Sequence, residues 1–133
     1  MVSILEEILR IFDDGLEDEL VSKALCFERN QGLAVLGDAV LDLVICEFTG
    51  PVFDPEEINR VRQGYAKRED HRKMINGDEL KQVIIESDYQ QPSKNIGLKR
   101  ADRYVEALIG AVYLKSRDID EVMRFVYSIY QFT

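Results

Sequence analysis

Apolar residues recur at the spacing of an amphipathic helix along most of this chain, and polar stretches with glycine or proline interrupt them. Helices are predicted at residues 2–12, 20–27, about 30–48, from 54 to the Asn76-Gly77 pair, 78–84, 98–114 and 118–130, with a loop at 87–97. No alternating strand pattern and no internal repeat accompany them. The pattern predicts an all-α fold in one domain that spans residues 1–133.

Residues 54–57 carry a clear signal for the start of a helix. Asp54 can accept hydrogen bonds from the first free backbone N–H groups, and Pro55 has the backbone angle that a first turn requires. Glu56 and Glu57 favour the positive end of the helix dipole. We therefore expect this helix to begin at Asp54.

The stretch from about 30 to 48 is apolar almost all round, so we expect a central, buried helix. It places Asp38 inside its hydrophobic stripe. A carboxylate that loses its hydration there needs a hydrogen bond, a counter-charge or a metal ion. Asp38 is therefore the first candidate for a functional residue.

A second apolar helix, at 98–114, carries Asp102 and Glu106 four residues apart, so the two acids can share a face. If the two core helices cross near Gly37 and Gly110, both acids can converge with Asp38. A divalent hard cation such as Mg²⁺ relieves the repulsion within such a group. The alternative is a structural ion pair, with Lys99 or Arg103 as the partner.

Composition limits the chemistry that remains. The chain has 133 residues, 46% of them hydrophobic and 32% charged, and no apolar run long enough to cross a membrane, which predicts a cytoplasmic protein. Cys26 and Cys46 lie in apolar helical patterns, so buried free thiols are expected, with a disulfide or redox pair as the alternative. His71 is the only histidine and lies in a charged run, so neither a zinc cluster nor a nucleophilic triad is expected.

The net charge of −8 argues against a nucleic acid partner, but its distribution changes the picture. Acids dominate residues 1–57, whereas bases outnumber acids in residues 58–103. A basic middle segment can follow a phosphate backbone. An ordinary solvated helix surface is the alternative.

Two sequence stretches resemble the ribonuclease III family. LGDAVLDLV at residues 36–44 is similar to its signature helix, and EALIGAVYL at 106–114 is similar to its second catalytic helix. The resemblance implies an all-helical homodimer that cuts double-stranded RNA with Mg²⁺ or Mn²⁺. It assigns catalysis and metal binding to Asp38 and Glu106, and Asp102 becomes a further metal ligand, through water.

The chain departs from the family pattern at three positions. The family usually has glutamates where this chain has Gln31 and Ala34, and an aspartate where it has Arg103, with Asp102 displaced by one residue. The resemblance implies an endonuclease domain without an RNA-binding domain, as in the small Mini-III branch, which similarly keeps only the acids at Asp38 and Glu106. This chain resembles that branch and compact archaeal relatives.

The predicted helix after Asp54 lies where the family contacts the RNA backbone. The expected RNA-binding residues are Arg60, Lys67, Arg68 and Arg72. Contacts to phosphates and 2′-hydroxyls are how proteins recognise duplex RNA by shape. The alternative is a solvated face whose bases pair with neighbouring acids.

The resemblance and the residues together predict a Mg²⁺-dependent endoribonuclease that hydrolyses phosphodiester bonds of double-stranded or structured RNA to 5′-phosphate and 3′-hydroxyl ends. Two alternatives remain open. One is a catalytically inactive protein of the same fold that binds structured RNA or serves as a dimeric scaffold, and the other is a helical dimerisation module with no RNA role.

Overall fold

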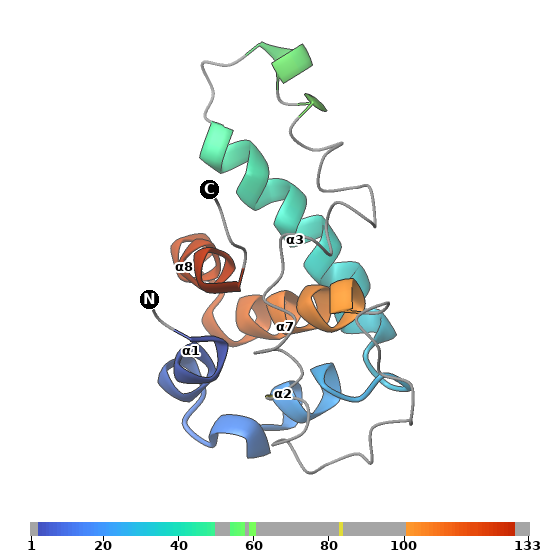
Figure 1. Ribbon diagram of the computed structural model, residues 1–133, viewed down its shortest axis with the longest axis vertical. Coiled ribbons are helices and arrows are strands. Elements are labelled where there is room, and N and C mark those ends of the chain that lie inside the picture. The colour runs from blue at the N-terminus through green and yellow to red at the C-terminus, as the bar shows by residue number, and fades with distance from the viewer. Residues whose placement is uncertain (1–2, 50–53, 58, 61–82, 84–100, 130–133) are drawn as a thin grey trace.

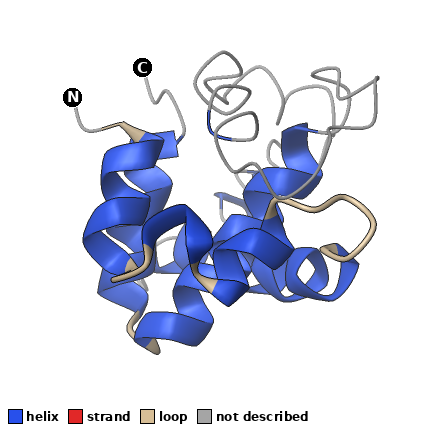
Figure 2. Ribbon diagram, turned by 90° about the horizontal axis from the view of Figure 1, so that it is seen from below, coloured by secondary structure: helices blue, strands red, loops and turns tan. Residues whose placement is uncertain are grey.

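The structure, a computed structural model, describes residues 3–49, 54–57, 59–60, 83 and 101–129, and every regular element in these residues is a helix (Figure 2). The elements are α1 (Ile4–Ile11), the short 3₁₀ helix η1 (Gly15–Glu17), α2 (Glu19–Ala24), α3 (Gln31–Thr49), α7 (Ala101–Ser116) and α8 (Ile119–Ile129). The predicted all-α class is confirmed for this part of the chain. The helix at 78–84 is described only at Val83, and the loop at 87–97 lies outside the described residues.

Side-chain caps set several of the helix starts. The Ser3 hydroxyl accepts a hydrogen bond from the Glu6 amide at 3.0 Å. The Asp18 carboxylate accepts a hydrogen bond from the Leu20 amide at 2.8 Å, so α2 begins at Glu19. The helix ends at Ala24, three residues before the end of the predicted stretch 20–27. The Asp54 carboxylate accepts from the Glu57 amide at 3.0 Å, which confirms the predicted start.

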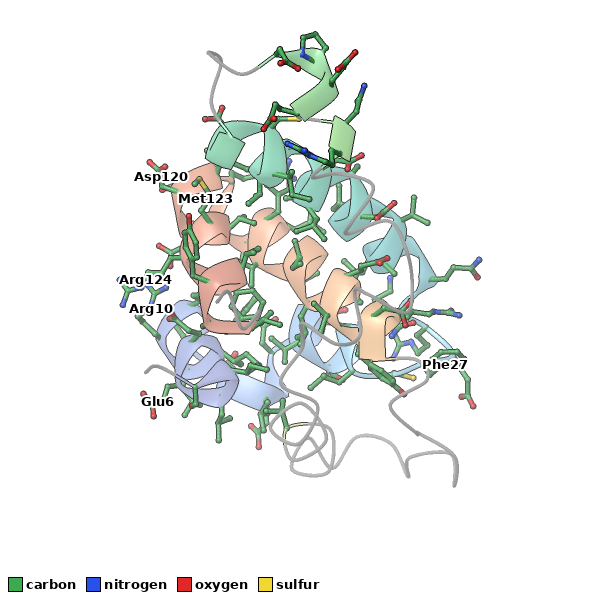
Figure 3. The ribbon with its side chains drawn as sticks, turned by 45° about the horizontal axis from the view of Figure 1, so that its top comes forward. Glu6, Arg10, Phe27, Asp120, Met123 and Arg124 are labelled. Atoms are coloured by element: carbon green, nitrogen blue, oxygen red, sulfur yellow. The ribbon has the colours of Figure 1, made fainter. Side chains whose placement is uncertain are left out.

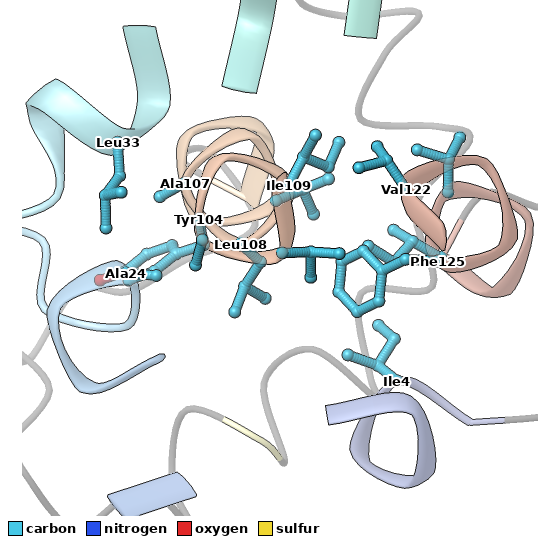
Figure 4. Packing of buried hydrophobic residues seen from close by; sticks show 14 of the residues in the cluster. Ile4, Ala24, Leu33, Tyr104, Ala107, Leu108, Ile109, Val122 and Phe125 are labelled. Atoms are coloured by element: carbon cyan, nitrogen blue, oxygen red, sulfur yellow. The ribbon is translucent and has the colours of Figure 1, made fainter. Parts of the chain in front are cut away.

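Helix α7 occupies the centre of the hydrophobic core. Figure 1 shows α3 crossing it on one side, with α1 and α8 packed along its other end. In Figure 4, Tyr104 and Ala107 of α7 lie towards α2 and α3, whereas Ile109 lies towards α8. Every α7 residue from Tyr104 to Val112 except Glu106 is buried, so α7 has contacts on almost all sides.

Helix α3 is not buried all round, contrary to the expectation from its sequence. Val35 is 68% exposed and Leu43 is 49% exposed, and Ala39 between them is exposed as well. Because α7 packs against the opposite side of α3, these side chains stay outside the core. The apolar composition correctly predicted that α3 packs in the core, but it did not predict that one face of α3 is exposed to solvent.

Four charged side chains join α1 to α8. Glu7 is almost fully buried, and its two carboxylate oxygens accept from Arg10 Nε at 2.6 Å and from Arg124 Nε at 3.3 Å. Arg10 also pairs with Glu121 of α8. Figure 3 shows Arg10 and Arg124 side by side at this junction. The network compensates the burial of the Glu7 charge and ties the first helix to the last.

Cys26 is buried, as predicted, whereas Cys46 is only half-buried. None of the helices in the described residues is long and apolar enough to cross a membrane.

Candidate functional site

The backbones of α3 and α7 touch where two glycines face each other. A Cβ atom added at Gly37 would lie 1.6 Å from the Glu106 carbonyl oxygen, and one added at Gly110 would lie 2.3 Å from the Leu33 carbonyl oxygen. Only residues without a side chain permit this approach. The two core helices therefore do cross at Gly37 and Gly110, which the sequence itself left open as a condition.

The crossing brings Asp38 and Glu106 to the same junction. Asp38 follows Gly37 directly, and the Glu106 carbonyl is the group nearest to Gly37. Asp38 is exposed, so the prediction that it loses its hydration is wrong. Its position explains this: successive helix residues differ by about 100° around the axis, so Asp38 turns away when Gly37 faces α7. Glu106 is half-buried.

Asp102 lies one turn before Glu106 and is 8% exposed. The three acids do not form one cluster: among the described residues, no group of three or more His, Cys, Asp or Glu side chains could hold a metal ion. Asp102 is held on the buried side of α7, whereas Asp38 lies on an open flank of α3. The expected three-acid convergence is therefore wrong, and an outer role for Asp102 through water stays a prediction.

Arg103 makes its contacts with the segment that leads into α3. Its Nε donates to the Asn30 side-chain oxygen at 2.9 Å, and its Nη2 donates to the Phe27 carbonyl at 3.2 Å. The guanidinium carbon also lies 4.1 Å from the centroid of the Phe27 ring. These contacts replace the ion pair with Asp38 that the sequence left open for Arg103. The other suggested partner, Lys99, lies outside the described residues.

Asn30 is the residue that sequence reasoning did not connect to the site. It is fully buried, its carbonyl accepts the Ala34 amide at 2.8 Å as α3 begins, and its side-chain amide donates to the Ala24 carbonyl at 2.9 Å. An asparagine directly before an apolar helical run is a known helix-start signal, and it could have identified Asn30. Nothing in the local pattern, however, indicates that Arg103 is its partner.

Tyr104 packs beside this junction, with its ring centroid 5.9 Å from that of Phe27. Burial raises the pKa of the Tyr104 hydroxyl above its ordinary value of 10.0. The nearby Cys26 and Glu28 act in the same direction, and the Arg103 cation opposes them. The tyrosine therefore stays neutral and acts as part of the core.

Of the four expected RNA-binding residues, the structure describes Arg60. It is exposed and forms an ion pair with Glu57, one turn earlier. Lys67, Arg68 and Arg72 lie outside the described residues, so their role stays a prediction.

The donor set at the crossing suits a hard divalent cation. Mg²⁺ takes oxygen ligands, keeps several of its waters and needs only one or two carboxylates from a protein. Asp38 and Glu106 supply two carboxylates from two helices whose backbones touch. Ala34, where a further acid was expected by resemblance, is a buried core residue. The residues present therefore fit a cation with a small protein ligand set.

Comparison with known proteins identifies the family of the chain. The family model for the Ribonuclease III domain matches residues 31–117, which is more than half of the chain. The matched region runs from the start of α3 to just past the end of α7. No curated protein and no solved structure matches the chain. The matched region contains both helices of the glycine crossing and both of its acids. The chain belongs to the ribonuclease III domain family, a family of RNA-cleaving nucleases.

Proposed function

We propose that the protein is a divalent-metal-dependent endoribonuclease that hydrolyses phosphodiester bonds in double-stranded or structured RNA. The observation that supports the proposal is the contact between α3 and α7 at Gly37 and Gly110, because the Glu106 backbone there meets the residue next to Asp38. The family assignment supplies the reaction class.

Asp38 and Glu106 would hold the cation. When bound, Mg²⁺ or Mn²⁺ supplies positive charge to the phosphodiester and lowers the pKa of water so that it can act as the nucleophile. Asp38 is exposed, so its carboxylate is accessible to a substrate as bulky as duplex RNA. Glu106 is half-buried on the most enclosed helix of the core, which restricts its movement. The exposed acid meets the substrate and the enclosed acid fixes the site.

The RNA contacts would come from the basic segment after Asp54. Arg60, Lys67, Arg68 and Arg72 are the proposed contacts to phosphates. Such contacts release counterions, so the affinity falls steeply as salt is added. Substitution of Lys67 and Arg68 by Glu should weaken RNA binding and reduce its salt dependence, which filter binding at several salt concentrations measures.

We also propose a homodimer, and the open face of α3 supports it. Val35, Ala39 and Leu43 are exposed and four residues apart, so they form one apolar strip beside Asp38. An apolar strip on a helix is typical of an interface. We propose that it packs against the same strip of a second copy.

Leu43→Glu tests the dimer, because it would place a charge on each side of a two-fold contact. Sedimentation should show dimers for the unchanged protein and monomers for this variant. Leu9→Glu is the matched control, since Leu9 is 56% exposed on α1, away from the strip. Equal sedimentation of all three proteins would refute the proposed interface.

An inactive RNA-binding protein of this fold is the second candidate function. It is favoured by Ala34, which is buried in the core, and by Arg103, which is engaged with Asn30 and Phe27, since neither position supplies a metal ligand. Cleavage assays distinguish the two functions.

The decisive assay is cleavage of a long duplex RNA with Mg²⁺ or Mn²⁺ by the unchanged protein, Asp38→Asn and Glu106→Gln. We expect metal-dependent cutting that each substitution reduces by at least about a hundredfold, because each removes one of two carboxylate ligands. Glu47→Gln, an exposed acid on the same helix as Asp38, should cut normally. A folded protein that binds the duplex and cuts it with neither metal would establish the inactive alternative.

A further inference from the structure

The hydrogen bonds of Arg103 indicate a role that its place in the sequence does not. Arg103 precedes Glu106 by three residues, so the two side chains leave α7 on neighbouring faces. Yet both of its described hydrogen bonds go to residues before α3, to the Asn30 side chain and the Phe27 carbonyl. Arg103 therefore links the helix of one candidate acid to the start of the helix that carries the other.

Asn30 is hydrogen-bonded to residues of α2, α3 and α7. Its side-chain oxygen accepts from Arg103, its side-chain amide donates to the Ala24 carbonyl at the end of α2, and its own carbonyl accepts the Ala34 amide. Because Asn30 is fully buried, water is not available to replace these bonds. The start of α3 is thereby fixed to both α2 and α7.

Rotation of α3 about its own axis is resisted on either side of the glycine crossing. The two glycines have no side chains to interlock, whereas buried α3 side chains such as Leu33 and Val40 do pack in the core. Asn30 lies seven residues before Gly37, about 10 Å along the helix, and its bonds lie away from the axis. The link between Arg103 and Asn30 therefore adds to the restraint on this rotation.

A small rotation of α3 matters at Asp38. A side chain reaches about 5–6 Å from the helix axis, so a rotation of about 20° moves the carboxylate by about 2 Å. Misplacement of a reacting group by about 1 Å can cost about a hundredfold in rate.

We infer that Arg103 is a positioning residue: through Asn30 it restrains the rotation of α3 and so sets the direction in which Asp38 leaves that helix. The inference rests on the proposed function for its effect on cleavage. Its effect on α3 itself does not depend on that function.

The first test is hydrogen exchange at the Ala34 amide, which bonds to the Asn30 carbonyl, followed by NMR. In Arg103→Met this amide should exchange about tenfold faster, because the anchor of its acceptor is lost. Arg103→Lys should lie between, since an ammonium cannot reproduce two fixed donors and a stacked plane. Arg29→Met, the same substitution at an exposed arginine of the same segment, should leave the exchange unchanged.

Asn30→Ala tests whether the two residues act as one unit. Adding Arg103→Met to Asn30→Ala should not accelerate the Ala34 exchange further, because the link is already broken. Independent, additive effects would overturn the inference.

The second test separates a positioning role from a merely structural one. For Arg103→Met, kcat for duplex RNA should fall about tenfold or more while KM stays within about twofold of the unchanged protein. If Arg103 contacted the RNA directly, KM would rise and the Ala34 exchange would not change. Faster exchange with an unchanged kcat would also overturn the inference, and would leave Arg103 a structural residue.

Mn²⁺ binding in the absence of RNA, followed by electron paramagnetic resonance of the free ion, distinguishes failure of the positioning role of Arg103 from failure of the proposed nuclease function. If the unchanged protein does not cut RNA, the proposed nuclease is refuted, but weaker Mn²⁺ binding in Arg103→Met than in Arg29→Met would still support the positioning role. Equal Mn²⁺ affinity in the two variants would refute it.

Discussion

Gly37→Ala is the substitution that tests the helix crossing most directly. The new Cβ atom would lie 1.6 Å from the Glu106 carbonyl oxygen, whereas a carbon and an oxygen in close contact stay about 3.3 Å apart. Both partners of this clash are backbone or directly attached to it, so no side-chain rotation relieves it. The two helices must separate by about 1.7 Å, and the separation disturbs the buried residues between them.

The expected loss of stability is the balance of two effects. Overpacking of a close-packed core costs about 1–3 kcal/mol, and more where backbones must shift, whereas alanine is favoured over glycine within a helix by about 1 kcal/mol. We expect a net loss of about 2 kcal/mol in the free energy of unfolding. RNA cleavage should fall further than stability does, because the displacement separates Asp38 from Glu106.

Gly32→Ala is the matched control, since it makes the same substitution in the same helix. A Cβ atom at Gly32 has no neighbour within 4 Å, so only the gain in helix propensity remains. We expect this variant to be more stable by about 0.5–1 kcal/mol. Urea unfolding followed by circular dichroism, at one fixed protein concentration because self-association adds to the apparent stability, measures both values.

Gly110→Ala sharpens the comparison because its Cβ atom meets the Leu33 carbonyl at the same crossing. One separation of the helices relieves both clashes, so the double variant with Gly37→Ala should lose clearly less stability than the two single losses added together. If Gly37→Ala were as stable as Gly32→Ala, the close crossing, and with it the argument for the site, would be wrong.

Three further substitutions test other parts of the fold. Glu7→Gln should lower the free energy of unfolding by about 1–2 kcal/mol in urea unfolding, because it weakens the bonds of a buried carboxylate to Arg10 and Arg124; an unchanged value would show that the network contributes nothing. Asp18→Ala should lose about 1 kcal/mol, and Asp18→Asn much less, since the cap of α2 needs only an oxygen acceptor; equal losses would contradict that. Burial raises the pKa of the Tyr104 hydroxyl above 10.0, so as the pH rises the unfolded chain releases this proton before the folded protein does. The free energy of unfolding is therefore unaffected by Tyr104 ionisation below about pH 10 and falls as the pH rises above 10. Tyr104→Phe should reduce the slope of unfolding free energy against pH above pH 10, and an identical slope would refute the assignment.

Much of the fold was predictable because helix formation depends on local spacing. The periods of apolar residues predicted α1 and α8 within one or two residues of their observed ends, and Asp54 was identified as a cap from its type and position alone. The sequence also showed that Gly37 and Gly110 would permit a close crossing of the two most apolar helices, but only the structure shows that they cross there. Among the described residues, the prediction missed η1, which begins at Gly15, where φ is +56°.

The environment of each side chain was less predictable. Asp38 was expected to be desolvated because its sequence neighbours are apolar, but α7 covers the Gly37 side of α3 and leaves the next residue in solvent. The same one-sided packing exposes Val35. Apolar composition shows that a helix has a buried side, but where a helix is apolar on every side, only its partner determines which side that is.

The sequence by itself determined most of the described helices and the two motifs, and it singled out Asp38 and Glu106 by their resemblance to the family. Only the tertiary structure decided that Asp102 is buried apart from Asp38, and that Arg103 bonds to an asparagine 73 residues away. The physical reason is that helical periodicity is set by neighbours within one or two turns of the chain. Burial and hydrogen-bond partners at a crossing are set by residues that only the packed fold brings together.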